Sequence, residues 1–252
     1  MKNKKLMFLV LTAVLAALVV VLQIVGGIPV GPFTITLTLF PIVVGAAVLG
    51  PVSGLILGLV FGVVVSILSL TGKDPGGQMV FLANPYLAWA LCLLKGAAAG
   101  VVPAFAYRLF SKHEKSATVV TYGFTGAFIF LGGAAVAWKL AGKTFGVQFL
   151  WTVILMLVAA GILIGMHVLF KNEKTAAYIA SILAPVCNTG IFVAGMLIFF
   201  PGLLKQWSGG TNVAIYTITG LVGVNFLIEF FVAVVLTPAL VAITNFAKKR
   251  GY

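Results

Sequence analysis

Two ionisable side chains lie inside long apolar runs, and they are the residues best placed to do chemistry in this sequence. Lys95 lies in the run at 86–110 and Glu229 in the run at 214–243. A charge within a bilayer costs at least about 2.5 kcal/mol on insertion scales, so each needs a partner, water or a ligand. Lys95 could bind a carboxylate or phosphate, and Glu229 could bind a cationic amine. A direct Lys95–Glu229 pair would instead be structural, and these interpretations stay open here.

Uncharged polar side chains recur in the same runs or at their edges. Asn188 follows Pro185, and Asn225 precedes Glu229 by about one helical turn. An amide offers both a donor and an acceptor, which suits a ligand with mixed functional groups, although an interhelical hydrogen bond is an equally good interpretation. Trp89 lies near the start of its run, where aromatic residues more often anchor the helix at the membrane surface.

No pattern predicts catalysis or a metal site. The sequence contains no Walker A loop, no Ser–His–Asp arrangement, no carboxylate pair and no Cys/His metal-ligand spacing. We therefore expect a protein that is not an enzyme and that holds no metal or cofactor of its own.

The composition indicates which elements must position these residues. The chain has 252 residues, of which 62% are hydrophobic and 8% charged, with a net charge of +12. Soluble domains are about 25% charged. The composition therefore excludes a soluble globular domain and a disordered chain, and it argues against a nucleic-acid partner despite the basic charge.

The apolar runs predict an all-α polytopic membrane bundle, because a helix crosses a bilayer with about 20 apolar residues. The first run continues to Val25 without a polar cleavage region, so we expect a retained helix rather than a signal peptide. The run at 35–49 is short and contains Pro41, which suggests a tilted or broken helix. The eight expected spans are 6–25, 35–49, 52–70, 86–110, 118–138, 147–170, 176–200 and 214–243.

The basic residues orient this bundle. With the N-terminus in the cytoplasm, eleven of the sixteen Lys and Arg residues fall on the cytoplasmic side and four fall outside. Cytoplasmic loops of membrane proteins carry this excess, so both termini are predicted to be cytoplasmic. The outer connections are then 26–34, 71–85, 139–146 and 201–213, and the stretch 71–78 of the second is expected to be a plain, turn-rich loop.

Small residues mark two helix faces. Gly50, Gly54, Gly58, Gly62 and Ser66 follow one another at four-residue spacing, which lets a neighbouring backbone approach closely. Packing within the chain is the favoured interpretation, and a surface over which another helix slides is the alternative. Ala13 and Ala17 form a second, weaker pair of this kind on the first helix.

Taken together, several segments resemble the substrate-specific S components of energy-coupling factor (ECF) transporters, the membrane subunits that bind vitamins for import. Residues 38–62 resemble the second and third helices of that family, and 84–108 resemble its fourth. Residues 184–192 and 223–239 resemble its fifth and sixth helices, while Ala13 and Ala17 match the motif by which its first helix docks on the energising module.

The resemblance implies one membrane domain over 1–252, with a six-helix core at 1–117 and 171–252. A helical hairpin at about 118–170 is an insertion relative to the family. It also implies a bacterial plasma-membrane protein that captures a micronutrient. The expected partners are an ECF coupling membrane protein and two ATPase subunits, which would hydrolyse ATP, together with the lipid bilayer.

The family's pocket is formed by its outer loops and the outer ends of its last helices. Lys95 favours a carboxylate-bearing vitamin, with a lean towards pantothenate, whereas Glu229 favours an amine such as a thiamine- or pyridoxamine-like ligand. A riboflavin-type specificity is a further alternative. The implied substrate-binding positions are Thr34, Thr36, Gln78, Asn84, Trp89, Lys95, Asn188, Asn225 and Glu229, and the implied docking positions are Ala13 and Ala17.

Two other classes of protein remain as hypotheses. The chain could be a self-sufficient secondary transporter that uses Glu229 as its proton site, although no internal repeat is evident. It could also be a structural or assembly protein of the membrane that binds no small molecule.

Overall fold

The structure is a computed structural model, and most of what it describes is helical. The elements before the central part of the chain are α1 (Lys4–Val25), β1 (Ile28–Val30), β2 (Phe33–Ile35), α2 (Leu39–Val48), α3 (Pro51–Leu70), α4 (Pro75–Ala83) and α5 (Pro85–Phe110). After it follow α8 (Thr175–Phe199), α9 (Pro201–Trp207), α10 (Val213–Tyr216) and α11 (Val224–Lys249). The described residues are 4–30, 33–35, 37–112, 175–210, 212–217 and 224–249.

The chain divides into two compact units, and the site described below lies in the first. That unit comprises Met1–Arg108 and Ala177–Tyr252, and the second comprises Leu109–Ala176. The expected spans at 118–138 and 147–170, and with them the expected inserted hairpin, lie outside the described residues.

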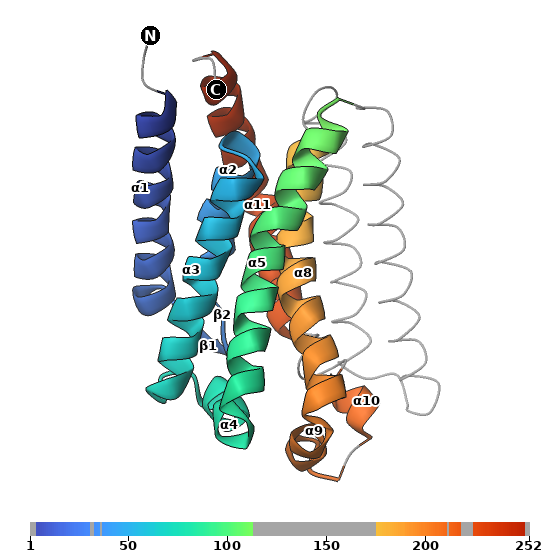
Figure 1. Cartoon of the computed structure of the whole chain (residues 1–252). Helices are drawn as coiled ribbons and strands as arrows, with labels where there is room; N and C mark the ends of the chain where they lie inside the picture. Colours follow the sequence, from blue (N-terminus) through green and yellow to red (C-terminus); the bar gives the residue numbers. More distant parts are fainter. Residues whose placement is uncertain are drawn as a thin grey trace, which may run out of the picture. The chain divides into compact units, whose positions relative to one another are not determined.

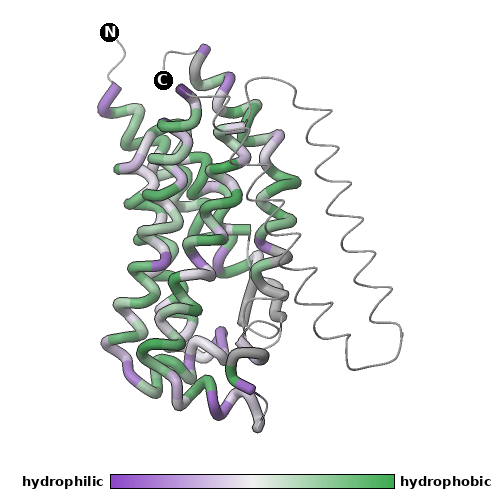
Figure 2. Tube along the Cα trace, turned by 90° about the vertical axis from the view of Figure 1, so that its right-hand side faces the viewer, coloured by the Kyte–Doolittle hydropathy of each residue, from purple (hydrophilic) through white to green (hydrophobic). Residues whose placement is uncertain are grey.

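Five of the described helices are long and apolar enough to cross a membrane, namely α1, α3, α5, α8 and α11, and α2 is a shorter apolar helix. A polytopic helical membrane bundle is therefore confirmed. Figure 1 places the start of α1 and the end of α11 at one end of the bundle, and α4 and α9 at the other. Figure 2 shows hydrophobic residues along most of the helix lengths, with hydrophilic residues mainly towards the two ends.

Two expected spans have different boundaries in the structure. The span expected at 35–49 is the ten-residue helix α2, which follows an antiparallel hairpin of β1 and β2 with Pro29 opposite Thr34. The span expected at 214–243 is described in two parts, α10 and α11, and residues 218–223 between them lie outside the described residues. Its second part, α11, continues to Lys249, beyond the expected end.

Two outer connections contain helices rather than plain turns. The connection expected at 71–85 contains α4, and the connection expected at 201–213 contains α9. Both helices begin with a proline at their first position, where the missing N–H costs nothing. A short helix in a polar connection has no long apolar run to reveal it, so the loop expected at 71–78 ends at Asp74 and its remaining residues belong to α4.

The stripe of glycines on α3 packs against a matching stripe on α5. A Cβ atom at Gly54 would meet the carbonyl oxygen of Gly100, and one at Gly58 would meet that of Gly96. One turn further along α3, a Cβ at Gly62 would lie 2.6 Å from the carbonyl oxygen of Cys92. The two backbones are therefore in contact over three helical steps, and this stretch of α3 is used for packing within the chain.

Candidate functional site

The close contact of α3 with α5 determines what surrounds Lys95. Lys95 directly precedes Gly96 on α5, and Phe61 directly precedes Gly62 on α3. Both side chains therefore start beside glycines of the α3–α5 contact. The Lys95 ammonium nitrogen lies 5.9 Å from the centre of the Phe61 ring and 5.0 Å from that of Phe192 on α8. The positive charge is thus bracketed by two aromatic rings from different helices.

These aromatic contacts stabilise the charge of Lys95 without satisfying its hydrogen bonds. A cation–π contact contributes about 0.5–2 kcal/mol, but an ammonium group has three N–H donors that seek oxygen or nitrogen acceptors. No ion pair within 4 Å of Lys95 occurs among the residues that the structure describes. The group therefore retains the capacity to bind an anion.

Glu229 is held by the neighbouring helix α8. Thr189 donates its hydroxyl hydrogen to one carboxylate oxygen over 3.1 Å, and the Asn188 amide approaches the two oxygens at 3.4 and 3.5 Å. The amide contacts are longer than the usual 2.9–3.0 Å and are correspondingly weak. A carboxylate accepts about four hydrogen bonds, so Glu229 can receive further donors.

Lys95 and Glu229 belong to one electrostatic cluster but do not form a direct pair. The charge of Lys95 acts on Glu229. Among the described residues, however, Lys95 contacts aromatic rings and Glu229 contacts the side chains of Thr189 and Asn188. The sequence had left open a buried Lys95–Glu229 pair, and the geometry separates the two groups by more than the 4 Å of an ion pair. Both remain available to a ligand.

Asn188 contributes an unused acceptor. Its side chain is only 7% exposed, and its Oδ1 atom has no hydrogen-bond partner among the described groups. Leaving such an atom buried and unpaired costs about 1–3 kcal/mol. A ligand O–H or N–H directed at this oxygen would recover that energy.

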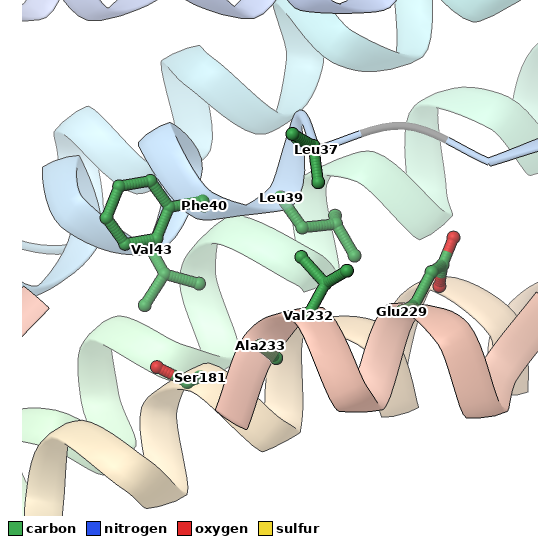
Figure 3. Close-up of a pocket in the computed structure, with 8 residues that line it drawn as sticks. All are labelled: Leu37, Leu39, Phe40, Val43, Ser181, Glu229, Val232 and Ala233. Atoms are coloured by element: carbon green, nitrogen blue, oxygen red, sulfur yellow. The ribbon is translucent and has the colours of Figure 1, made fainter. Parts of the chain in front are cut away.

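A small cavity lies beside Glu229, between α2, α8 and α11. Its volume of about 20 Å³ holds roughly one water molecule. In Figure 3, Glu229 and Ser181 lie at opposite ends of an otherwise apolar lining. A vitamin-sized molecule needs a pocket of about 300–1,000 Å³, so this cavity as it stands does not hold one. The lining residues are Leu37, Leu39, Phe40, Val43, Ser181, Glu229, Val232 and Ala233.

Asp74 is a charged residue near this cluster that sequence reasoning missed. It lies in the turn before α4, and Lys95 acts on its carboxylate electrostatically. Burial raises the pKa of the Asp74 carboxyl, and the positive charge of Lys95 offsets only part of that rise. The only sequence signal was a charged residue in a connection otherwise rich in glycine, and the folding of that turn towards α5 could not be read from it.

Three of the expected site residues take part in the structure of the end of the bundle that contains α4 and α9. Asn84 accepts a hydrogen bond from the Leu87 backbone N–H over 3.1 Å and so caps the start of α5. Trp89 packs edge-on against Phe81 with 6.0 Å between ring centres. Gln78 lies on α4 with its amide beside Gly72. These contacts give each residue a structural role, and their contact with substrate stays a prediction.

The other expected positions are described only in part. Thr34 is in β2 and Asn225 in the first turn of α11, and only their backbone is described. Thr36 lies outside the described residues.

The expected docking residues on α1 face away from the rest of the bundle. Ala13 and Ala17 are exposed, whereas α1 buries Thr12, Val19 and Gln23. Thr12 donates a hydrogen bond to Ser53 over 3.2 Å, and Gln23 accepts one from Thr38 over 2.8 Å. The polar residues of α1 thus bind the neighbouring elements, and the side with the two alanines stays open to lipid or a partner.

Comparison with protein-family models gives a match over the first part of the chain. A family model for the substrate-specific component of ECF transporters matches residues 7–141, which is more than half of the chain. The matched region contains Lys95 and Asp74 but not Asn188 or Glu229. No curated protein matches the chain significantly.

Proposed function

The chain belongs to the ECF transporter substrate-specific component family, and on that basis we propose that it captures a carboxylate-bearing vitamin, with pantothenate as the favoured candidate. As a substrate-specific component it acts with other ECF components on a small-molecule substrate. The partners that we propose are a coupling membrane protein and two ATPases, with a bacterial plasma membrane as the location. We propose neither a catalytic role nor a cofactor for this chain.

The observation that carries the choice of substrate is the environment of Lys95. Its ammonium group is bracketed by Phe61 and Phe192 and has no ion pair within 4 Å among the described residues. A carboxylate placed there forms charge-assisted hydrogen bonds, which are roughly twice as strong as neutral ones. Pantothenate also carries amide and hydroxyl donors, which suit the unpaired Oδ1 of Asn188.

The proposal is tested by comparing pantothenate with panthenol, in which a hydroxymethyl group replaces the carboxylate. Binding to the purified chain in detergent is measured by calorimetry. We expect pantothenate to bind at least about tenfold more tightly, since a hydrogen bond to a charged group contributes about 1.5–3 kcal/mol. Equal affinities would contradict the role of Lys95 as the anion-binding group, and preferential binding of thiamine or pyridoxamine would favour the amine alternative at Glu229.

A second candidate function follows from Glu229, whose carboxylate lies within a membrane span. Such a residue could carry a proton in a self-sufficient transporter. Reconstitution separates the two functions. A substrate-specific component requires the other ECF components and ATP for uptake, whereas a proton-coupled transporter alone in liposomes takes up substrate until the proton gradient is collapsed.

A further inference from the structure

Phe192 lies on the face of α8 that meets both charged groups of the site. Its ring centre is 5.0 Å from the ammonium nitrogen of Lys95. Thr189 and Asn188, three and four positions earlier on the same helix, contact the carboxylate of Glu229. Residues three and four positions apart share one face of a helix. One face of α8 therefore carries the ring beside Lys95 and, one turn away, the polar groups that hold Glu229.

The packing of α8 against α5 fixes the position of this ring. A Cβ atom at Gly195 on α8 would meet the end of the Leu91 side chain on α5. Leu91 lies one turn before Lys95, and Gly195 lies about one turn after Phe192. The two helices, which run side by side in Figure 1, are thus antiparallel at this contact. Phe192 is held opposite Lys95 by helix packing and not by its own contacts alone.

The two charged groups would attract each other if no side chain separated them. Opposite charges attract strongly where water is excluded. A lysine side chain is flexible, and one helical turn is only about 5.4 Å long. Even so, Lys95 contacts aromatic rings and Glu229 contacts the polar side chains of α8. A direct pair would use up the positive charge that the proposed function assigns to the substrate carboxylate.

We propose that Phe192 is a positioning residue of the substrate site, whose ring keeps the ammonium group of Lys95 from pairing with Glu229 and so leaves it available to an anionic ligand. The inference rests on the proposed binding of a carboxylate at Lys95. An aromatic face stabilises a cation modestly but offers it no oxygen acceptor. A ligand carboxylate therefore has no internal carboxylate to displace.

The test is the preference of Phe192→Ala for pantothenate over panthenol, measured by calorimetry on the purified full chain in detergent at neutral pH. Without the ring, Lys95 can reach Glu229. Pantothenate affinity is then expected to fall at least about tenfold, the lower end of the coupling measured between close charge pairs. Panthenol, which carries no charge, does not compete with Glu229 for the ammonium group and should lose less affinity.

A rescue by Glu229→Gln separates this role from a merely structural one. Glutamine keeps an oxygen that can accept the Thr189 hydrogen bond but carries no negative charge. In the Phe192→Ala background it should restore most of the preference for pantothenate, whereas the gain in the native chain should be clearly smaller. A cavity left by the missing ring would not be filled by this substitution, so a structural role predicts no rescue.

Phe61→Ala is the matched control. It removes the other ring beside Lys95, which comes from α3 and not from the helix that holds Glu229. Glu229→Gln should therefore not rescue its effect. If Phe192→Ala does not fold, Phe192→Val carries the same comparison, because it keeps some apolar bulk but leaves the place of the ring open.

A second measurement needs no ligand. Thermal unfolding is compared for Lys95→Met, Glu229→Gln and the double variant, in the native chain and in Phe192→Ala. Two substitutions are non-additive when the residues interact directly. We expect stronger coupling between them in the Phe192→Ala background, because only there do the two groups form an ion pair.

The outcomes distinguish this inference from the proposed function. If the native chain prefers pantothenate and Phe192→Ala keeps that preference, or loses it without rescue by Glu229→Gln, the role of Phe192 is overturned and the proposed function stands. If the native chain does not bind pantothenate, the proposed substrate is rejected and thermal unfolding decides on Phe192. Equal coupling of Lys95 and Glu229 in both backgrounds would then overturn its role.

Discussion

At the scale of single residues, the two charges inside the spans are accommodated by different means. Lys95 lies between the rings of Phe61 and Phe192, and Glu229 is bound by the polar side chains of α8. Aromatic rings stabilise a cation but leave its N–H donors unused, whereas the hydroxyl of Thr189 satisfies part of a carboxylate. The remaining hydrogen-bonding capacity is therefore largest at Lys95, which makes it the residue whose removal should affect an anionic ligand most.

Replacing Lys95 with alanine tests that conclusion. We expect the affinity for pantothenate to fall about 10- to 150-fold, the equivalent of a charge-assisted hydrogen bond of about 1.5–3 kcal/mol. Thermal unfolding in detergent should shift little, since the described residues offer Lys95 no ion pair to lose. Lys205→Ala, at an exposed position on α9, is the matched control and should change neither quantity. Unchanged pantothenate binding by Lys95→Ala would reject the anion-binding role.

At the scale of elements, the glycine stripe explains why a lysine can be placed so close to an aromatic ring of the neighbouring helix. The carbonyl oxygens of α5 occupy the space that side chains at Gly54 and Gly58 would fill. Membrane helices associate through such close backbone contact because no hydrophobic effect drives them together in lipid. Any side chain at these positions pushes α3 from α5 and moves Phe61 relative to Lys95.

Gly58→Ala is therefore expected to be destabilising and to weaken ligand binding. Its Cβ atom would meet the Gly96 backbone, which has no flexible end that can yield. Overpacking of this kind costs about 1–3 kcal/mol, and thermal unfolding in detergent with a ligand titration measures both effects. The matched control is Gly190→Ala on α8, where no atom lies within 4 Å. Equal behaviour of the two variants would show that the α3–α5 contact tolerates separation.

At the scale of the whole molecule, α1 stands out as the least buried of the five described spans. It buries only three residues, all of them on one side, and two of these are polar residues that hydrogen-bond to α3 and to the residue before α2. Ala13 and Ala17 are exposed and lie about 100° and 140° around the helix from this buried side. Small exposed side chains permit close approach of a partner helix, which supports docking of the coupling protein on this face.

Ala13→Trp tests this docking face. A large ring at an exposed position should leave the fold and ligand binding intact but block close approach of a partner helix, so that ATP-dependent uptake in liposomes is lost. Leu18→Trp is the control, because Leu18 is also exposed but points about 100° around the helix from Ala17. Full uptake by Ala13→Trp, or equal loss in both variants, would contradict docking through the alanine pair.

The sequence by itself determined the class of protein and the residues at which to look. Long apolar runs predict membrane helices because an uninterrupted helix satisfies its own backbone in lipid, and the described part of the chain contains five such helices. A charge inside such a run is costly wherever the helix packs, so Lys95 and Glu229 could be selected without a structure. The S-component resemblance is confirmed by the family match over 7–141.

Only the tertiary structure decided which of these residues meet. Asn188 and Glu229 are 41 positions apart, and contact between them depends on how α8 and α11 are packed, which no local pattern encodes. The helices in the outer connections depend likewise on how a polar turn folds back. A hydropathy value measures how readily one residue type transfers from water into the bilayer. It carries no information on the rotation of one helix against another, and that rotation decides whether polar side chains form a site.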